Sequence, residues 1–467
     1  MMQRLSSTTG LPDRVRQPQF DRTKLKPGIV HIGIGAFHRA HQAVFTQHAL
    51  EAEFGPWGII AVNLRSPEPV EALAAQDGLY SITTRSEAGD QSEVIGATVD
   101  WICAANDGAR VLSALADPAI RVVTLTVSEK AYGLDPATGG LDHAHQAIAA
   151  DLKWPDAPVG VLGFLVEGLA LRRAAGLAPY TVLCCDNLPS NGNVVRRLVL
   201  EMARLRDPAL ADWIADKGRF PCSMVDRIVP AATGATRLRA ERLLGAQDAL
   251  AIDTEPFLQW VIEDDFVSGR PAWEAGGAIF AGNVEPYEKM KLRLLNGTHT
   301  LLAHLGILGD LDYIRDVMAV PHLAAKARLH MEEVVSTLDP VPGIDLPAYI
   351  DDLLARFSNP TIDHRNIQIA LDTTQKLPQR LLAPTVDMLA KGQTAGATAY
   401  AVGVWMASVK KRGDCGDPRR SEVIAAAASM GATDPSAPFF AIAGLFPQEL
   451  IDARDWRDRI NAAILWF

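Results

Sequence analysis

The stretch that most restricts the fold of this 467-residue chain is a strand, a glycine turn, a helix and a second strand between residues 28 and 64. Residues 28–35 are GIVHIGIG, a short β-branched run that ends on Gly33 and Gly35. This order predicts a βαβ unit whose glycines let the backbone approach a dinucleotide pyrophosphate. The motif is incomplete, because its third glycine position holds His38. We expect such a cofactor to contact the turn residues Gly33, Ile34, Gly35 and Phe37.

The residues after the second predicted strand bear on the choice between NAD and NADP. In the usual pattern this strand ends near an acid that binds the adenosine ribose hydroxyls. Here Arg65 and Ser66 come first and Glu68 follows. Glu68 favours NAD, whereas Arg65 and Ser66 could hold the additional phosphate of NADP. We predict NAD, with NADP as the alternative.

Further strands and helices alternate down to about residue 283, which predicts an α/β domain with a parallel sheet. Strands are expected at residues 79–85, 94–102, 120–127 and 180–185, and helices at 143–152, 160–175 and 193–206. Open α/β sheets bind ligands at the carboxyl ends of their strands. Glu129 and Asn187 follow two of the most apolar runs, so we place both in a cleft. The alternative for Asn187 is an Asx turn that caps the next helix.

The sequence changes character near residue 284, where helical periodicity replaces the alternation of strands and helices. Helices are expected at residues 291–308, 321–338, 346–357, 362–374, 380–391, 395–411, 422–430 and 447–466. The predicted fold class is therefore α/β, with a Rossmann-type dinucleotide-binding domain at residues 1–283 and a mostly helical domain at 284–467.

The start of the helical domain combines one candidate base with two polar residues in an apolar helix. At about 100° per residue, Lys291, His299 and Asn296 fall at about 0°, 80° and 140°, so all three can line one wall of a cleft. Desolvation there would favour the neutral amine of Lys291, which can accept a proton. The alternative is a lysine that extends to water and a histidine satisfied in the core. Gly297, unfavourable inside a helix, predicts a close approach to the backbone.

Composition excludes several classes of function. The formal net charge is −10, which argues against binding to nucleic acids or acidic membranes, because both need a basic protein surface. The five cysteines form no CxxC pair, which is typical of reduced thiols in the cytoplasm. No metal-ligand spacing occurs, since the histidine pairs near residues 38 and 143 lack a carboxylate or a third ligand. We also expect no signal peptide and no membrane-spanning segment.

Four motifs in order resemble the polyol-specific long-chain dehydrogenases, the family of mannitol 2-dehydrogenase and fructuronate reductase. They are GIGAFHRAHQA at 33–43, CDNLPSNG at 185–192, MVDRI at 224–228 and KLRLLNGTH at 291–299, and the resemblance extends from about residue 28 to about 410. It implies a Rossmann-type domain followed by a mostly helical domain, the use of NAD or NADP, and no catalytic metal. The family includes monomers, so the resemblance implies no dimer.

The resemblance also assigns roles to single residues. It implies that Lys291 is the general base, that Asn187 and Asn296 are the amides flanking the reacting oxygen, and that His299 positions the substrate. Glu129 matches a glutamate beside the base, and Asp226 and Lys376 match polar positions near the substrate cleft. Next to Asp226, Arg227 leaves a structural ion pair as the alternative for this site.

Within the family, the segment from residue 359 to 380 is most similar to the fructuronate reductase branch. Gln368 stands where mannitol dehydrogenases tend to carry an arginine, and Arg293 and Arg380 could bind the carboxylate of a sugar acid. A surface salt bridge is the alternative for each arginine. We therefore expect a cytoplasmic NAD-dependent enzyme that interconverts D-fructuronate and D-mannonate. The alternatives are a mannitol 2-dehydrogenase or another polyol dehydrogenase and, in a different class, an inactive nucleotide-binding regulatory protein.

Overall fold

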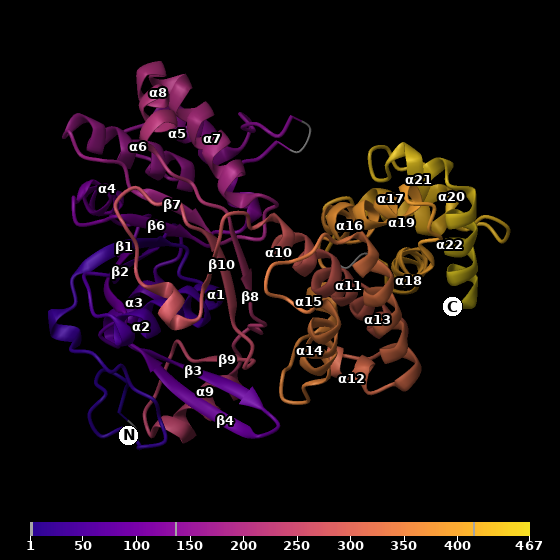
Figure 1. The fold of residues 1–467 in the computed structure, drawn as a ribbon, viewed down its shortest axis with the longest axis horizontal. Helices are drawn as coiled ribbons and strands as arrows, with labels where there is room; N and C mark the ends of the chain where they lie inside the picture. The colour runs from indigo at the N-terminus through magenta and orange to yellow at the C-terminus, as the bar shows by residue number, and fades with distance from the viewer. Residues whose placement is uncertain (1–2, 136–137, 414–415) are drawn as a thin grey trace. The chain divides into compact units, whose positions relative to one another are not determined.

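The computed structural model describes residues 3–135, 138–413 and 416–467, and the chain divides into two compact units, Met1–Val284 and Glu285–Phe467 (Figure 1). We call them unit 1 and unit 2. The boundary expected from sequence, between residues 283 and 284, lies next to this division.

Unit 1 contains a five-stranded sheet in which every neighbouring pair is parallel. The strand order is β5-β2-β1-β6-β7, with β1 at Pro27–Ile32, β2 at Gly58–Asn63, β5 at Thr98–Cys103, β6 at Val122–Leu125 and β7 at Thr181–Cys184. The order reverses between β1 and β6, which creates the crevice where doubly wound sheets bind ligands. This arrangement confirms the predicted Rossmann-type fold.

The strands are apolar along their whole length because helices cover both faces of the sheet. Alternate side chains enter two different cores: Val30 and Ile32 of β1 pack into one cluster, and Ile29 packs into the other. The first cluster includes residues of α4 (Gly108–Ala116), α6 (Val161–Ala174), α7 (Asn191–Arg206) and α8 (Pro208–Lys217). The second includes residues of α1 (Ala36–Ala40), α2 (Gln42–Ala52) and α3 (Glu68–Ala75).

The predicted strand at 94–102 is wrong in one respect, because the chain forms two strands there. β4 (Gly89–Ile95) pairs antiparallel with β3 (Tyr80–Ser86), and β5, which starts at Thr98, pairs parallel with β2. The chain passes from one sheet to another at Gly96, where a Cβ would lie 2.8 Å from the Arg22 side chain. Hydrophobicity alone does not reveal which partner a strand selects.

Two smaller sheets and two further helices complete unit 1. One sheet has the strand order β4-β3-β9, with β9 at Ile252–Thr254. The other has the order β11-β10-β8, with β11 at Ile279–Ala281, β10 at Gln259–Glu263 and β8 at Ser223–Asp226. The remaining α-helices described in unit 1 are α5 (Gln146–Lys153) and α9 (Gly234–Leu244).

Unit 2 is built of helices in its described residues. Its longer helices are α11 (Gly297–Leu308), α13 (Pro321–Val334), α14 (Leu346–Ser358), α17 (Ala383–Ala390), α18 (Gly396–Arg412), α19 (Arg420–Ala428) and α22 (Arg454–Trp466). The shorter ones are α10 (Glu285–Met290), α12 (Ile314–Met318), α15 (Asn366–Ile369), α16 (Thr373–Leu377), α20 (Ala437–Phe440) and α21 (Gln448–Asp452). Helix α11 is buried from Gly297 to Ile307, as expected of a central helix.

Several segments of unit 2 differ from the regular helices that the periodicity predicts. Residues Lys291–Asn296 and Pro378–Leu382 are π-helical and contact each other. The predicted helix at 362–374 is interrupted, because Asp372 has a positive φ of 53° before α16 begins. Among the described residues, no helix combines the length and apolar character needed to cross a bilayer.

Candidate active site

The glycine turn after β1 has the geometry that only glycine allows. Gly33 has a φ of +104°, and a Cβ there would lie 2.1 Å from the carbonyl oxygen of Thr126, which follows β6. The turn therefore packs directly against the neighbouring strand end at the switch point of the sheet. Gly35 is the N-cap of α1, and a Cβ there would have only one neighbour, the Gly33 oxygen at 4.0 Å.

The incomplete glycine motif has a structural explanation in a pair of stacked imidazoles. His38 stacks on His31 of β1 with ring centroids 3.3 Å apart and planes at 10°. The Nε2 of His31 lies 3.0 Å from the Gly33 carbonyl oxygen, and its Nδ1 lies 2.8 Å from Thr124 Oγ1. Burial lowers the pKa of His31 to about 3 and that of His38 well below its usual value. A neutral ring pair thus supports the turn where the third glycine would pack.

A groove of about 540 Å³ lies at the carboxyl ends of β1, β2 and β6. Gly33, Gly35, Arg65 and Ser66 line it, together with residues 126–128 and the start of α6. The other predicted cofactor contacts lie elsewhere: Ile34 is buried, Phe37 stacks on His41 at 4.9 Å, and Glu68 is exposed in the first turn of α3. Of the two charged residues that the sequence links to the choice between NAD and NADP, Arg65 borders the groove and Glu68 does not.

The loops that carry Glu129 and Asn187 are held by Asp186. Its carboxylate accepts hydrogen bonds from the backbone N–H groups of Val127 and Ser128, both at 3.0 Å, and from the Tyr132 hydroxyl at 2.7 Å. Burial raises the pKa of Asp186, and these three donors oppose that shift. The exposed side chains of Glu129 and Asn187 therefore project from two loops that one carboxylate fixes.

Asn191 holds the other side of the Asn187 loop. Its amide nitrogen donates to the carbonyl oxygens of Cys184, Asp186 and Ser223, and its amide oxygen accepts from the Ser223 N–H. Helix α7 begins at Asn191 and its N-cap residue is Ser190, which makes no side-chain cap hydrogen bond, so Asn187 is not the N-cap residue of this helix.

Asp226 ends β8 and is 4% exposed, whereas the neighbouring Arg227 binds the backbone. The Arg227 guanidinium donates to the carbonyl oxygens of Ala40 and Glu255. Burial lowers its pKa to about 10. Arg227 is therefore structural, while Asp226 remains a candidate for substrate contact.

Unit 2 brings together four of the predicted residues, Lys291, Asn296, His299 and Arg380. Lys291 is only 6% exposed, which does not match a lysine that extends to water. The Nη1 of Arg380 lies 3.4 Å from the Asn296 carbonyl oxygen and 3.2 Å from Thr300 Oγ1. The side-chain oxygen of Asn296 is buried and has no hydrogen-bond partner in the described part of the chain.

The close approach predicted at Gly297 involves the second π segment. A Cβ at Gly297 would lie 2.9 Å from the carbonyl oxygen of Arg380 and 3.1 Å from the His330 ring. The two π segments thus meet at a residue without a side chain, which brings Arg380 beside Asn296. Because a π turn uses i→i+5 hydrogen bonds, the 100° steps assumed from sequence do not apply between Lys291 and Asn296.

His299 lies in an apolar and cationic environment. Its ring is 4.6 Å from the Phe357 ring and 5.0 Å from the His364 ring, which stands edge-on at 88°. Burial, followed by the charges of His364, Arg356, Arg380 and Lys291, lowers the pKa of His299 well below its usual value. Its Nε2 has no partner within the described residues. His299 is therefore not the satisfied core histidine of the alternative interpretation.

Arg293 and Lys376 do not join this set. Arg293 forms an ion pair with Asp387 at 2.6 Å and donates to the Thr337 carbonyl oxygen at 3.1 Å. A salt bridge is the alternative that the sequence leaves open for Arg293. The Lys376 ammonium donates to the carbonyl oxygens of Ile369 and Leu371 at the end of α15. Both cations are engaged by protein groups, and their contact with a substrate stays a prediction.

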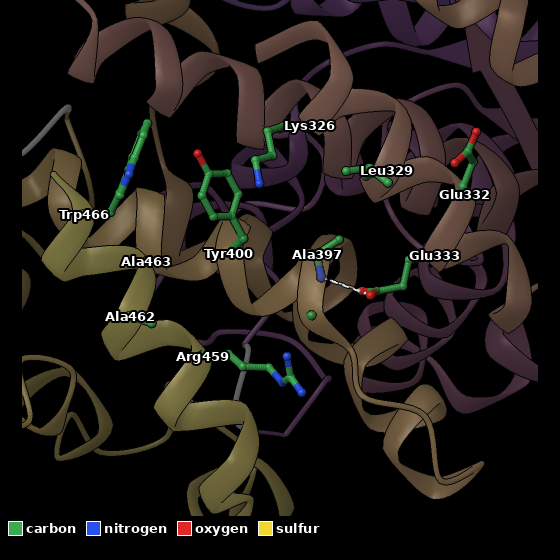
Figure 2. Close-up of a pocket in the computed structure, with 11 residues that line it drawn as sticks. Lys326, Leu329, Glu332, Glu333, Ala397, Tyr400, Arg459, Ala462, Ala463 and Trp466 are labelled. Atoms are coloured by element: carbon green, nitrogen blue, oxygen red, sulfur yellow. Dashed lines mark hydrogen bonds between the residues drawn. The ribbon is translucent and has the colours of Figure 1, made fainter. Parts of the chain in front are cut away.

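A larger hollow in unit 2, of about 900 Å³, contains none of the candidate residues (Figure 2). It lies between α13, α18 and α22, where Lys326 stands 4.6 Å from the Tyr400 ring centroid and Trp466 is exposed. The larger volume of this hollow therefore does not make it the reactive site.

Among the described residues, no group of three or more His, Cys, Asp or Glu side chains could hold a metal ion.

A parallel sheet with a glycine turn at its switch point, followed by a separate helical unit, defines a Rossmann-type protein with a helical C-terminal domain. Residues 27–275 match the mannitol dehydrogenase Rossmann domain, and residues 283–461 match the mannitol dehydrogenase C-terminal domain. The chain belongs to the mannitol dehydrogenase family and is an oxidoreductase.

Relatives of the chain differ in their substrates. The chain is 42% identical to D-mannonate oxidoreductase of Escherichia coli over 96% of this chain and 95% of that protein. It is 39% identical to mannitol 2-dehydrogenase of Cereibacter sphaeroides over 84% of this chain and 82% of that one. Its structure is similar to that of Pseudomonas fluorescens mannitol 2-dehydrogenase in a ternary complex with NAD and D-mannitol, with a TM-score of 0.90, 34% identity and coverage of 99% and 96%.

Four residues that shape the site receive no role from the sequence motifs: His31, Asp186, Asn191 and His364. All four lie inside or beside stretches that carry the family resemblance. A polar residue within an apolar strand, such as His31, signals a required hydrogen bond, so the sequence does contain a signal for it. The contacts of Asp186 and Asn191 join residues up to 59 apart and depend on the sheet order.

Proposed function

We propose that the chain binds NAD in the unit 1 groove and interconverts D-fructuronate and D-mannonate. The observation that carries the proposal is the environment of His299, whose Nε2 has no partner among the described residues and whose pKa is lowered by burial and then by the bases His364, Arg356, Arg380 and Lys291. Cations around an unsatisfied polar group favour an anionic ligand over a neutral one. The 42% identity to a D-mannonate oxidoreductase supports the same substrate class.

The groove residues fit a dinucleotide. A side chain at Gly33 would occupy the space next to Thr126, and Gly35 presents its backbone without a side chain. Arg65 and Ser66 border the same groove, where they could meet the adenosine ribose. Bound NAD would supply the hydride acceptor, and the NAD complex of the Pseudomonas fluorescens enzyme supports this choice of cofactor. NADP remains the alternative.

The residues of this chain would handle the proton. Lys291, as the amine, takes the proton of the substrate's secondary hydroxyl as hydride leaves its carbon, and as the ammonium returns it in the reduction. The amides of Asn187 and Asn296 donate to the developing alkoxide, which stabilises its charge without an acidic proton. His299 holds a neighbouring substrate hydroxyl, and Glu129 and Asp226 supply polar contacts from unit 1.

A second candidate function is the oxidation of a neutral polyol such as D-mannitol. The structural similarity to Pseudomonas fluorescens mannitol 2-dehydrogenase, which was solved with D-mannitol, favours it. The mechanism would be the same, but the cationic environment of His299 would contribute nothing to recognition of an uncharged substrate. The catalytically inactive regulatory protein is disfavoured, because Lys291, Asn187, Asn296 and His299 are all present.

The test is a panel of hexonates, hexuronates and polyols, assayed for initial rates with NAD and with NADP. We expect D-mannonate with NAD to give a higher kcat/KM than D-mannitol by at least about tenfold, the factor that about 1.4 kcal/mol of differential binding provides. A clear preference for D-mannitol would overturn the sugar-acid assignment. Cofactor binding without turnover of any compound would overturn the catalytic assignment as a whole.

A further inference from the structure

Two imidazoles in unit 2 each have a buried ring nitrogen that no group in the described part of the chain satisfies. His299 on α11 and His364 in the segment before α15 have ring centroids 5.0 Å apart and planes at 88°. The Nε2 of His299 and the Nδ1 of His364 have no hydrogen-bond partner within the described residues. Since buried polar atoms are nearly always paired, two such nitrogens side by side indicate a ligand group that binds there.

The position of His364 is fixed by the surrounding backbone. Its carbonyl oxygen accepts a hydrogen bond from the Ile314 N–H at 3.1 Å, and the Asn366 N–H donates to the Asp312 carbonyl oxygen at 2.9 Å. The Asn366 side chain also donates to the Leu311 carbonyl oxygen at 2.9 Å. Three contacts with residues at or just before the start of α12 therefore hold this segment. The ring of His364 is presented by ordered backbone and not by an isolated loop tip.

The groups that influence His299 are bases. After burial, those that lower the pKa of His299 are His364, Arg356, Arg380 and Lys291. Burial also lowers the pKa of His364, to about 4, so its ring is neutral at pH 7. A neutral imidazole can donate one N–H hydrogen bond to an anion, and nearby guanidinium groups strengthen the binding of the same anion.

We propose that His364 is a specificity-determining residue that donates from Nδ1 to the carboxylate of a sugar-acid substrate, beside His299 and Arg380. This inference rests on the proposed function and goes beyond it by naming the residue that distinguishes a sugar acid from a polyol. His364 does not act on the reacting carbon. It therefore contributes to the binding of carboxylated substrates, and neither proton transfer nor cofactor binding depends on it.

The experiment compares D-mannonate with D-mannitol, both with NAD, in the wild type and in three variants of His364. His364→Phe keeps a ring and removes both nitrogens, and His364→Leu covers the case in which the larger ring does not fold. We expect both variants to raise KM for D-mannonate by about 10- to 100-fold, the loss expected for one hydrogen bond to a charged group. The expected changes in kcat and in KM for D-mannitol are below about threefold, since an uncharged substrate offers no such bond. His364→Asn, which restores a donor, is expected to recover most of the loss.

His322→Phe is the matched control, because His322 is exposed at the start of α13 and its variant should have wild-type kinetics. Circular dichroism shows whether each variant folds. An equal rise in KM for D-mannonate and D-mannitol, or no rise in either, would overturn the role of His364 while leaving the oxidoreductase assignment intact. A wild type that oxidises neither compound with either cofactor would instead overturn the proposed function.

Discussion

The two units form their candidate sites from different parts of the polypeptide. In unit 1 the groove is lined by main chain at Gly33 and Gly35, where His31 contacts the Gly33 carbonyl oxygen, and at Val127 and Ser128, whose N–H groups donate to Asp186. In unit 2 the site consists of side chains, with unpartnered polar atoms on Asn296 and His299 among the described residues. A main-chain site recognises groups that many molecules share, such as a pyrophosphate, whereas a side-chain site recognises one substrate class. Substitutions should therefore affect the two units in different ways.

The largest expected effect is the loss of Lys291. Lys291→Ala should lower kcat by about 10²–10⁴-fold, because general-base catalysis typically contributes this factor. The affinity for NAD should change by less than about threefold, since the cofactor groove belongs to unit 1. Stopped-flow rates and fluorescence titration with NADH measure the two quantities separately. Lys289→Ala is the control, because Lys289 is a more exposed lysine paired with Glu285. Unchanged turnover in Lys291→Ala would remove this residue from the mechanism.

The second prediction concerns the main-chain site. Gly33→Ala should weaken NAD binding about 10- to 100-fold, because an alanine at a φ of +104° is strained and its Cβ would overlap the Thr126 carbonyl oxygen. Calorimetric titration with NAD measures the loss, and Gly10→Ala is the control, since Gly10 also has a positive φ but no atom within 4 Å of its Cβ position. If Gly33→Ala bound NAD normally, the groove would not be the cofactor site.

These two predictions reflect what the sequence can and cannot provide. The β-branched runs and the Gly33 turn predict the parallel sheet because burial on both faces and a positive φ leave clear traces in residue types. The partners of cations leave none: Arg293 pairs with Asp387, far away in the sequence, and Lys376 binds main-chain carbonyls. The π segments are not predictable in this way, because the same residue types satisfy an α-helix. His364 needs the fold to bring it beside His299.

The third prediction compares how the two units respond to acid. Buried neutral histidines have folded-state pKa values below the unfolded value of about 6.5, so the stability they contribute is complete above that pH and is lost as the pH falls towards the folded value. Each buried neutral histidine should lower the free energy of unfolding by about 2 kcal/mol as the pH falls from about 6.5 to about 5. Unit 1 contains His31 and His38. Unit 2 contains His299, His304, His330 and His364, whose pKa values burial also lowers.

Unit 2 should therefore lose its structure at a higher pH than unit 1. Hydrogen exchange at about pH 7 and about pH 5, analysed by mass spectrometry of peptides from each unit, measures this difference after correction for the intrinsic exchange rate. We expect peptides of α11 and α13 to lose protection before peptides of β1 and β6. His322→Gln is the control, because it removes an exposed histidine of the same unit. The reverse order, with the sheet of unit 1 opening first, would contradict the prediction.

The smallest expected effects are on the choice between NAD and NADP, because Arg65 and Glu68 are not buried and solvent screens their charges. Arg65→Gln should weaken NADP about 3- to 10-fold and NAD less than about twofold, since the guanidinium borders the groove and its charge would pair with the additional phosphate of NADP but not with the ribose hydroxyls of NAD. Glu68→Gln should strengthen NADP about twofold by removing a like charge at the start of α3. Fluorescence titrations with NADH and NADPH measure all four affinities, and Glu71→Gln, one turn further along α3, is the matched control. A loss of NAD affinity above about tenfold in Glu68→Gln would show that the Glu68 carboxylate binds the ribose, as the sequence pattern predicts. In that case a side chain, and not the main chain, would select the cofactor in unit 1.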